Sequence, residues 1–388
     1  MAIHPTVQAL FDWLVDGATG AATPMAVLER FCPDLVEAGV PLDRVQAFVR
    51  TLHPSFMGRR FLWERGVKEV KAFDASWSLI NSPSFQASHV HKVFATGEKV
   101  RFRLTPEAEL TEDLAGLRSQ GFTDWVVFPL KFMSGTTHGI TFSTKAPRGF
   151  TDEHLATLWY AVRPLTRVGE TLAQMRTAVN LLNAYVGIDA GERILNGQIQ
   201  RGDTHDIHCV IWFSDLRGFT SMSANRTPKE IITILNEFFE CQVPAIESEG
   251  GQVLKFIGDG LLAIFPIGKR DAKAAGEGAV RATTAAFDAL TKLNEKRQAR
   301  GDGELSFGVA LHLGEVAYGN IGGASRLDFT AIGPAVNLAS RIEGMTGKLG
   351  KKVLLSSQLA KELSVPTRSA GLAELKGLTE KVELFEPA

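Results

Sequence analysis

The sequence has few of the features that place a chain in a specialised class. It contains only 3 cysteines among 388 residues, and Cys32, Cys209 and Cys241 are too far apart to suggest a disulfide framework or a zinc site. Cysteines of this kind are usually small core residues in a reducing compartment. The sequence therefore predicts three reduced cysteines and a cytoplasmic location.

Charge of one sign and long apolar runs are also missing. The formal net charge is −1, so no broad basic surface is expected and nucleic acid is not a predicted partner. The longest apolar runs, such as residues 261–267, are too short to span a bilayer, and the N-terminus lacks the basic and apolar stretches of a signal peptide. With 45% hydrophobic and 22% charged residues, the composition is that of a globular protein with two or three domains.

The first part of the sequence suggests helices followed by strands. Apolar residues recur with helical periodicity in residues 7–15, 24–31 and 42–52. Residues 123–132 and 138–146 instead resemble two strands that flank a turn. We therefore expect a largely helical N-terminal segment and a later antiparallel hairpin.

A long helix is expected to begin after this hairpin. Thr151, in the stretch FTDEHL, is a suitable N-cap because acidic residues follow it in the first turn. An antiparallel hairpin followed by such a helix is similar to the end of a GAF domain, a family of small-molecule-binding or dimerising sensor modules. This resemblance implies that residues 1–157 form a helical and GAF-like α/β sensor domain. The sequence leaves its ligand open.

The same helix carries a heptad pattern, which predicts a coiled-coil linker over residues 158–202. Pro164 predicts a kink or a restart. The alternative is a helix that packs on its own domain, although such helices usually have a broader apolar stripe. The a and d positions are all apolar: Leu158, Leu165, Leu172, Val179 and Val186 lie seven apart, and Ala161, Val168, Met175 and Leu182 follow three later.

Residues 203–388 alternate strands and helices, which predicts an α+β domain with helices against a mixed sheet. A long alanine-rich helix is expected over residues 270–300. Asp215 ends a predicted strand, and Asp259 lies at the tip of the hairpin in VLKFIGDGLLAIFP. Adjacent strands would bring these carboxylates together, and a hard divalent cation such as Mg²⁺ or Mn²⁺ would relieve their repulsion. Taken singly, each aspartate is more typical of an ordinary turn residue.

Asn337 and Arg341 are four residues apart in the predicted helix of AVNLASRIEGM, so they share one face. An amide and a guanidinium on one face suit a ribose and a phosphate. In isolation, the same pair also fits a solvated helix face.

Five stretches together resemble the class III nucleotidyl cyclase catalytic domain, the family of adenylate and guanylate cyclases. The resemblance extends from about residue 205 to 385 and implies a ferredoxin-like fold. It also implies conversion of ATP to 3′,5′-cyclic AMP and pyrophosphate, with two divalent metal ions in each active site. In this family one subunit supplies the metal ligands of a site, and the other subunit supplies its Asn and Arg. Because this chain contains both sets, the resemblance further implies a homodimer. The five stretches are FSDLRGFT, LKFIGDG, GEVAYGNIGG, RLDFTAIGPAVNLASRIE and LKGLTEKVELF.

The resemblance also implies a role for each matching residue. The carboxylates of Asp215 and Asp259 and the carbonyl of Leu216 would bind Mg²⁺ or Mn²⁺. Asn337 would orient the ribose, and Arg341 would stabilise charge on the reacting phosphate. The groups implied to contact the triphosphate are the backbone amides of residues 217–220, which include Gly218, Phe219 and Thr220, and the side chain of Lys381.

Lys255 and Thr330 match the family's base-reading pair and favour ATP, because guanylate cyclases typically have an acidic residue and a small thiol or hydroxyl there. Threonine is both donor and acceptor, so a guanylate or dual-specificity cyclase stays open. A catalytically silent cyclase-like regulatory protein is a further alternative. A diguanylate cyclase is not expected, since its Gly-Gly-acidic-Glu-Phe signature is missing. The N-terminal domain is expected to regulate the cyclase.

Overall fold

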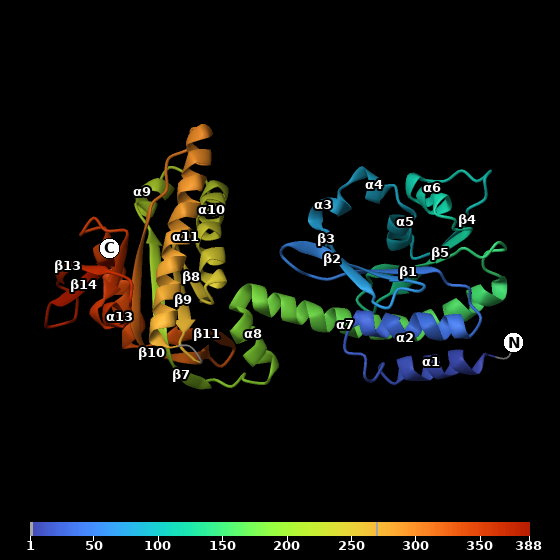
Figure 1. Ribbon diagram of the computed structural model, residues 1–388, viewed down its shortest axis with the longest axis horizontal. Coiled ribbons are helices and arrows are strands. Elements are labelled where there is room, and N and C mark those ends of the chain that lie inside the picture. Colours follow the sequence, from blue (N-terminus) through green and yellow to red (C-terminus); the bar gives the residue numbers. More distant parts are fainter. Residues whose placement is uncertain (1–2, 269–270) are drawn as a thin grey trace. The chain divides into compact units, whose positions relative to one another are not determined.

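The computed structural model describes residues 3–268 and 271–388. The chain divides into two compact units, Met1–Ala184 and Tyr185–Ala388 (Figure 1). Across the described ranges, no helix combines the length and the hydrophobicity that crossing a bilayer requires. Each unit has its own sheet and its own hydrophobic core.

The first unit is built on a six-stranded antiparallel sheet in the order β3-β2-β1-β6-β5-β4. Helices α1, α2 and α7 cover one face, and α5 and α6 cover the other (Figure 1). The elements are α1 Pro5–Val15, α2 Pro24–Glu37, β1 Arg44–Arg50, β2 Phe56–Glu64, β3 Lys71–Ser76, α3 Trp77–Ile80, α4 Pro83–Gln86, α5 His89–Thr96, β4 Val100–Arg103, α6 Glu112–Ser119, β5 Asp124–Lys131, β6 Thr137–Thr144 and α7 Asp152–Val186.

Strand β5 explains why both faces of this sheet must be covered. Val126 and Phe128 point into the core beneath α1, α2 and α7, whereas Trp125 and Val127 point into the core beneath α5 and α6. Successive side chains of a strand alternate between faces, so an uninterrupted apolar run fits a strand buried on both sides. The predicted hairpin of β5 and β6 is confirmed.

The prediction of a helix over residues 42–52 is wrong, whereas the two helices before it are confirmed as α1 and α2. Residues 44–50 form β1, which pairs with β2 on one side and with β6 on the other. Val45 and Ala47 are buried on one face. The short apolar segment fits either period, and pairing with two distant strands decided the outcome.

Helix α7 continues through Pro164, so the helix does not restart there, and a kink at this proline stays a prediction. Thr151 caps its start as expected, because its hydroxyl accepts a hydrogen bond from the backbone N–H of His154 at 3.2 Å. The first half of the heptad stripe packs on its own domain: Leu158, Ala161, Leu165 and Val168 are buried in the core of the first unit.

Packing on the unit's own sheet is the alternative to a coiled coil, and it holds for this part of the helix. Met175, further along the stripe, is 62% exposed. A coiled coil stays a prediction for the residues after Val168.

The second unit is a mixed α+β fold. Its eight-stranded sheet has the order β13-β14-β12-β10-β7-β9-β8, with β11 paired to β10, and among the strand pairs of the described residues only β10 and β12 run parallel. The elements are α8 Ile188–Leu195, β7 Thr204–Leu216, α9 Phe219–Ser223, α10 Pro228–Ser248, β8 Gln252–Ile257, β9 Gly260–Pro266, α11 Ala272–Ala299, β10 Phe307–Gly323, β11 Arg326–Ile332, α12 Pro334–Thr346, β12 Val353–Ser356, α13 Ser357–Glu362, β13 Thr367–Ala373 and β14 Val382–Pro387.

The central strand β7 separates two cores in this unit. Val210 and Trp212 face α10 and α11, whereas Cys209 and Ile211 face α8 and α12. All three cysteines are buried and free, as predicted. The long helix expected over residues 270–300 is confirmed as α11, and residue 270 itself lies outside the described residues.

Candidate active site

Two aspartates meet at one edge of the second sheet. Strand β7 pairs antiparallel with β9, and this register places Asp215 opposite Gly260. Asp259 precedes Gly260 at the tip of the β8–β9 hairpin, where Gly258 adopts a positive φ of 64° that suits glycine. Strand pairing therefore brings together two carboxyl groups that are distant in the sequence.

The electrostatics of this pair favour a bound cation. Burial, the charge of Asp259 and a hydrogen bond with Asp259 raise the pKa of Asp215 to about 6, against a smaller lowering effect from the backbone N–H of Leu216. Two carboxyl groups this close resist full ionisation. A divalent cation would remove that penalty, and carboxylate oxygens are suitable ligands for Mg²⁺ or Mn²⁺.

A third carboxyl group, which the sequence analysis missed, lies nearby. Burial raises the pKa of Glu343 on α12 to about 7, and the charges of Asp215 and Asp259 add to this shift. Helix α12 packs closely on β10 here: a Cβ atom added at Gly308 would lie only 2.1 Å from Thr346 Oγ1 and 2.7 Å from Glu343 Oε1. Only the tertiary packing of α12 could have revealed this neighbour.

Asp215 and Asp259 form a carboxyl pair that Glu343 influences through its charge. Within residues 3–268 and 271–388, no three histidine, cysteine or acidic side chains are grouped as a preformed metal site. Leu216, the expected backbone ligand, is the last residue of β7 and is buried. The donors fit a cation that also takes oxygen ligands from a phosphate or from water.

The loop after β7 presents unpaired backbone donors. Gly218 has a positive φ of 71° and precedes α9, whose first residues are Phe219 and Thr220. Backbone N–H groups in the first turn of a helix have no partner within that helix. This position suits the phosphate contacts that were predicted for Gly218, Phe219 and Thr220, whereas the Arg217 N–H already donates to the Ser306 carbonyl oxygen at 2.8 Å.

Lys255 and Thr330 are held on strands β8 and β11. The Lys255 ammonium makes an ion pair with Asp328, which lies two residues before Thr330 on the same strand. Residues two apart in a strand share a face, so Lys255 Nζ is directed toward the face that carries Thr330. The sequence analysis missed Asp328. Its spacing of two residues from Thr330 in an expected strand could have indicated that both lie on one face.

Asn337 and Arg341 lie on an exposed face of α12 and line a concave site of about 490 Å³. Neither side chain has a hydrogen bond or an ion pair within the described part of the chain. Glu343 is two residues beyond Arg341, which corresponds to about 200° around a helix. Asn337 and Arg341 therefore face away from the aspartate pair of their own chain.

His312 is buried beside Asn337 and Arg341, whereas Lys381 is exposed and lies outside their concave site. His312 lines the same concave site, and burial lowers the pKa of its imidazole to about 4. Lys381, which the resemblance places on the triphosphate, is exposed and makes an ion pair with Glu374 at 3.0 Å. It does not line the concave site of Asn337 and Arg341.

The fold and these motifs agree with one protein family. Residues 203–385 match the sequence model of the adenylate and guanylate cyclase catalytic domain. This match covers the strands and helices that carry all the residues described above. The C-terminal part of the chain is therefore similar to the catalytic domain of adenylate and guanylate cyclases.

Individual relatives are adenylate cyclases. An adenylate cyclase of Anabaena cylindrica is 35% identical over 214 residues, which are 53% of this chain and 41% of that protein. Adenylate cyclase 1 of Rhizobium meliloti is 31% identical over 45% of this chain and 26% of its own length. The crystal structure of the adenylyl cyclase CyaB from P. aeruginosa is 27% identical, with a TM-score of 0.43 over 48% of this chain and 96% of that chain.

This chain spans less than half the length of the two curated relatives. Both are cyclases, and the family match does not extend to residues 1–202. The GAF-like interpretation of residues 1–157 stays a prediction, as do the individual roles of the site residues.

Proposed function

We propose that the protein is an adenylate cyclase, which converts ATP to 3′,5′-cyclic AMP and pyrophosphate at two equivalent sites of a homodimer. The pairing of Asp215 with Asp259 at the β7–β9 edge carries this proposal. Burial and the neighbouring Asp259 raise the pKa of Asp215, and a cation between the two carboxyl groups would allow both to stay ionised. A nucleotide triphosphate brings such a cation with it.

Asp215, Asp259 and the carbonyl of Leu216 would hold two Mg²⁺ or Mn²⁺ ions. When bound, these ions lower the pKa of the ribose 3′-hydroxyl and neutralise the triphosphate. The chain's own contribution is to position the substrate and to stabilise charge. Backbone N–H groups of Phe219 and Thr220 would bind phosphate oxygens, and Lys381 would exchange Glu374 for the triphosphate.

The reaction itself is an in-line displacement at the α-phosphorus. The ribose 3′-oxygen forms the new bond, the bond to the bridging oxygen breaks, and pyrophosphate leaves. Asn337 would orient the ribose for this attack. Arg341 would donate hydrogen bonds to the phosphate oxygens on which negative charge develops.

The two faces of α12 support the proposed homodimer. Asn337 and Arg341 face away from the aspartates of their own chain, so one chain by itself does not assemble the whole set. The concave site that they line would complete the active site of a second copy, and twofold symmetry would then create two sites.

Recognition of the base would depend on Lys255 and Thr330. Lys255 would donate to the adenine edge, and the Thr330 hydroxyl would accept from the adenine amino group. Thr330 is neutral and is 8% exposed, so it rejects a guanine carbonyl less strongly than a carboxylate would. We therefore keep some use of GTP as a second candidate activity.

Residues 1–157 would form a cytoplasmic sensor domain that regulates the cyclase. The chain passes from the first unit to the second within α7, at residues 184 and 185. A shift of this helix would thus be transmitted along the chain into the catalytic unit. A ligand could cause it only by binding one arrangement better than another.

Cyclase activity is tested with purified protein, ATP and Mg²⁺ or Mn²⁺. We expect cyclic AMP and pyrophosphate in equal amounts, and we expect Asp215→Ala and Asp259→Ala each to lose activity by at least about a thousandfold. Asp288→Ala, at an exposed position of α11, is the matched control and should retain activity. If folded Asp215→Ala protein keeps full activity, the metal assignment is wrong.

A further inference from the structure

The first unit contains a cavity of about 320 Å³ between its sheet and two of its helices. The volume is at the lower end of the range for small-molecule sites. Most of the wall is apolar, and it comes from α2, from strands β1, β2, β5 and β6, and from α7. Residues of this wall include Val27, Leu28, Phe61, Ile140, Leu165 and Leu172.

The position of this cavity follows from the packing of α7. The first part of the heptad stripe is buried in the core, as far as Val168. Beyond it, Leu172, Met175 and Val179 line the cavity instead of filling it. Gly169 lies on the same face, and a Cβ atom at this position would meet no other atom within 4 Å. The cavity therefore exists because α7 lacks a large side chain where it passes over the sheet.

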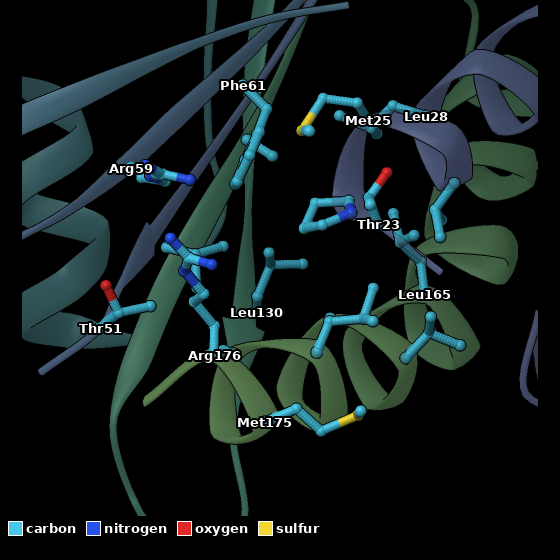
Figure 2. A pocket seen from close by; sticks show the side chains of 18 of the residues that line it. Thr23, Met25, Leu28, Thr51, Arg59, Phe61, Leu130, Leu165, Met175 and Arg176 are labelled. Atoms are coloured by element: carbon cyan, nitrogen blue, oxygen red, sulfur yellow. The ribbon is translucent and has the colours of Figure 1, made fainter. Parts of the chain in front are cut away.

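One side of the cavity is polar and positively charged. Figure 2 shows Thr51, Arg59 and Arg176 on the side opposite Leu28 and Leu165. Among the described residues the Thr51 hydroxyl oxygen has no hydrogen-bond partner, but it is covered by protein atoms and does not face the cavity. The polar groups that could reach a ligand are therefore the two guanidinium groups.

The two arginines have unused donors. Arg176 is exposed, and within the described ranges it makes no hydrogen bond or ion pair. Arg59 donates from Nε to Asp74 at 2.6 Å, and its two terminal nitrogens donate no hydrogen bond among the described residues. Guanidinium groups bind carboxylates through paired N–H donors. The polar side of the cavity thus offers positive charge to one anionic group.

We propose that this cavity binds an amphipathic carboxylate, with an apolar body against α2 and α7 and a carboxylate head at Arg59 and Arg176. The apolar body would fill space that is now empty, which is favourable because buried apolar surface leaves water. The head would accept hydrogen bonds from the free guanidinium donors and neutralise Arg176. Binding here is independent of the cyclase reaction.

The other occupant to consider is a second copy of α7. Met175 lines the cavity and is largely exposed, so a helix could cover the opening. A helix that offered Met175 to its partner would bring an apolar side chain beside the charge of Arg176, however, and would supply no anion to it. The charges of the polar side therefore favour a carboxylate over an apolar side chain.

The test is titration calorimetry of the full chain with decanoate, 1-decanol and decyltrimethylammonium. We expect saturable binding of decanoate at one site per chain, weaker binding of decanol and none of the cation. Arg176→Gln should weaken decanoate binding by about tenfold or more. Arg163→Gln removes an exposed charge from the same helix outside the cavity and should leave the affinity unchanged.

Gly169→Leu provides the second test, because it fills the cavity and replaces a glycine by a better helix former. It should abolish decanoate binding while the melting temperature is kept or raised. Three results would overturn the proposal. They are no saturable binding of decanoate, equal affinity for decanol and decanoate in the wild type, and a Gly169→Leu variant that loses dimerisation while the wild type binds none of the probes.

Discussion

At the scale of the residue, Lys255 illustrates how one charge is directed by its neighbours. Its ion pair with Asp328 holds the ammonium beside the strand that carries Thr330. Both partners are partly exposed, at 37% and 54% of their side chains, so the pair contributes little to stability. The ion pair instead orients Lys255, because it holds this long, flexible side chain at the position proposed for the base.

We expect base preference to change when this pair of positions is changed. Lys255→Glu combined with Thr330→Cys exchanges donor and acceptor at the purine edge, and the ratio of kcat/KM for GTP to that for ATP should rise by about tenfold or more. Asp328→Asn alone should raise KM for ATP more than it lowers kcat. Lys292→Glu, on an exposed face of α11, controls for net charge. An unchanged nucleotide ratio would remove Lys255 and Thr330 from base recognition.

His138 makes a prediction about acid stability. It is buried in the first unit, where Nδ1 accepts a hydrogen bond from the Arg50 backbone N–H at 3.1 Å. Burial, and then the charge of Arg50, lower the pKa of His138 from 6.5 to about 4. The unfolded chain therefore binds the proton more readily than the folded chain between these two values. Stability from the neutral imidazole is present above pH 6.5 and is lost as the pH falls through 4.

The size of this effect is at most ~3 kcal/mol, since each unit of pKa corresponds to about 1.4 kcal/mol. His138→Asn keeps an acceptor but cannot be protonated, so its unfolding midpoint in urea should fall less between pH 7 and pH 4.5. Exposed His205 gives the control variant His205→Asn, which should follow the wild type. Identical pH profiles for wild type and His138→Asn would contradict the prediction.

At the scale of the element, the single helix α7 contributes residues to both units. Its residues from Leu158 to Val168 pack in the core of the first unit. Its last residue, Val186, packs against a core of the second unit. The proposed regulation requires that a change in the helix between these points alter the catalytic unit.

We expect insertions after Ala184 to show whether this helix couples the units. Two added residues rotate the following helix by about 200°, whereas seven rotate it by about 700°, close to two full turns. The two-residue insertion should change basal cyclase activity severalfold, and the seven-residue insertion should leave it near that of the wild type. Equal activities in all three proteins, with and without decanoate, would show that residues 1–157 do not regulate through α7.

At the scale of the whole molecule, the division of the site between two copies is the feature to test. Asp215→Ala and Arg341→Ala should each be inactive, because each removes one half of every site. Mixed in equal amounts, they should regain about one quarter of wild-type turnover. Half of the dimers are then mixed, and each mixed dimer has one intact site of two.

The control is a mixture of the Asp215→Ala protein with the Asp259→Ala protein. This mixture should regain no turnover, because both changes remove the carboxylate half of the site. Heterodimer formation is followed with two differently tagged copies. If heterodimers form and the first mixture stays inactive, Asn337 and Arg341 do not act across a subunit interface.

The sequence by itself determined the features that depend on local order. Motif order identified the catalytic domain, and the alternation of apolar and turn residues predicted the β8–β9 hairpin with Asp259 at its tip. The four-residue spacing of Asn337 and Arg341 was enough to place them on one helix face. Such features depend on neighbours within a few residues, which a single sequence records directly.

Only the tertiary structure decided the features that depend on distant segments. Residues 42–52 became a strand because β2 and β6 pair with them, and Glu343 approaches Asp215 because α12 packs closely on β10 at Gly308. The heptad stripe of α7 was visible in the sequence, yet the sheet buried its first half and left a cavity beside the second. Apolar residues specify that a surface is buried, and the rest of the fold determines what buries it.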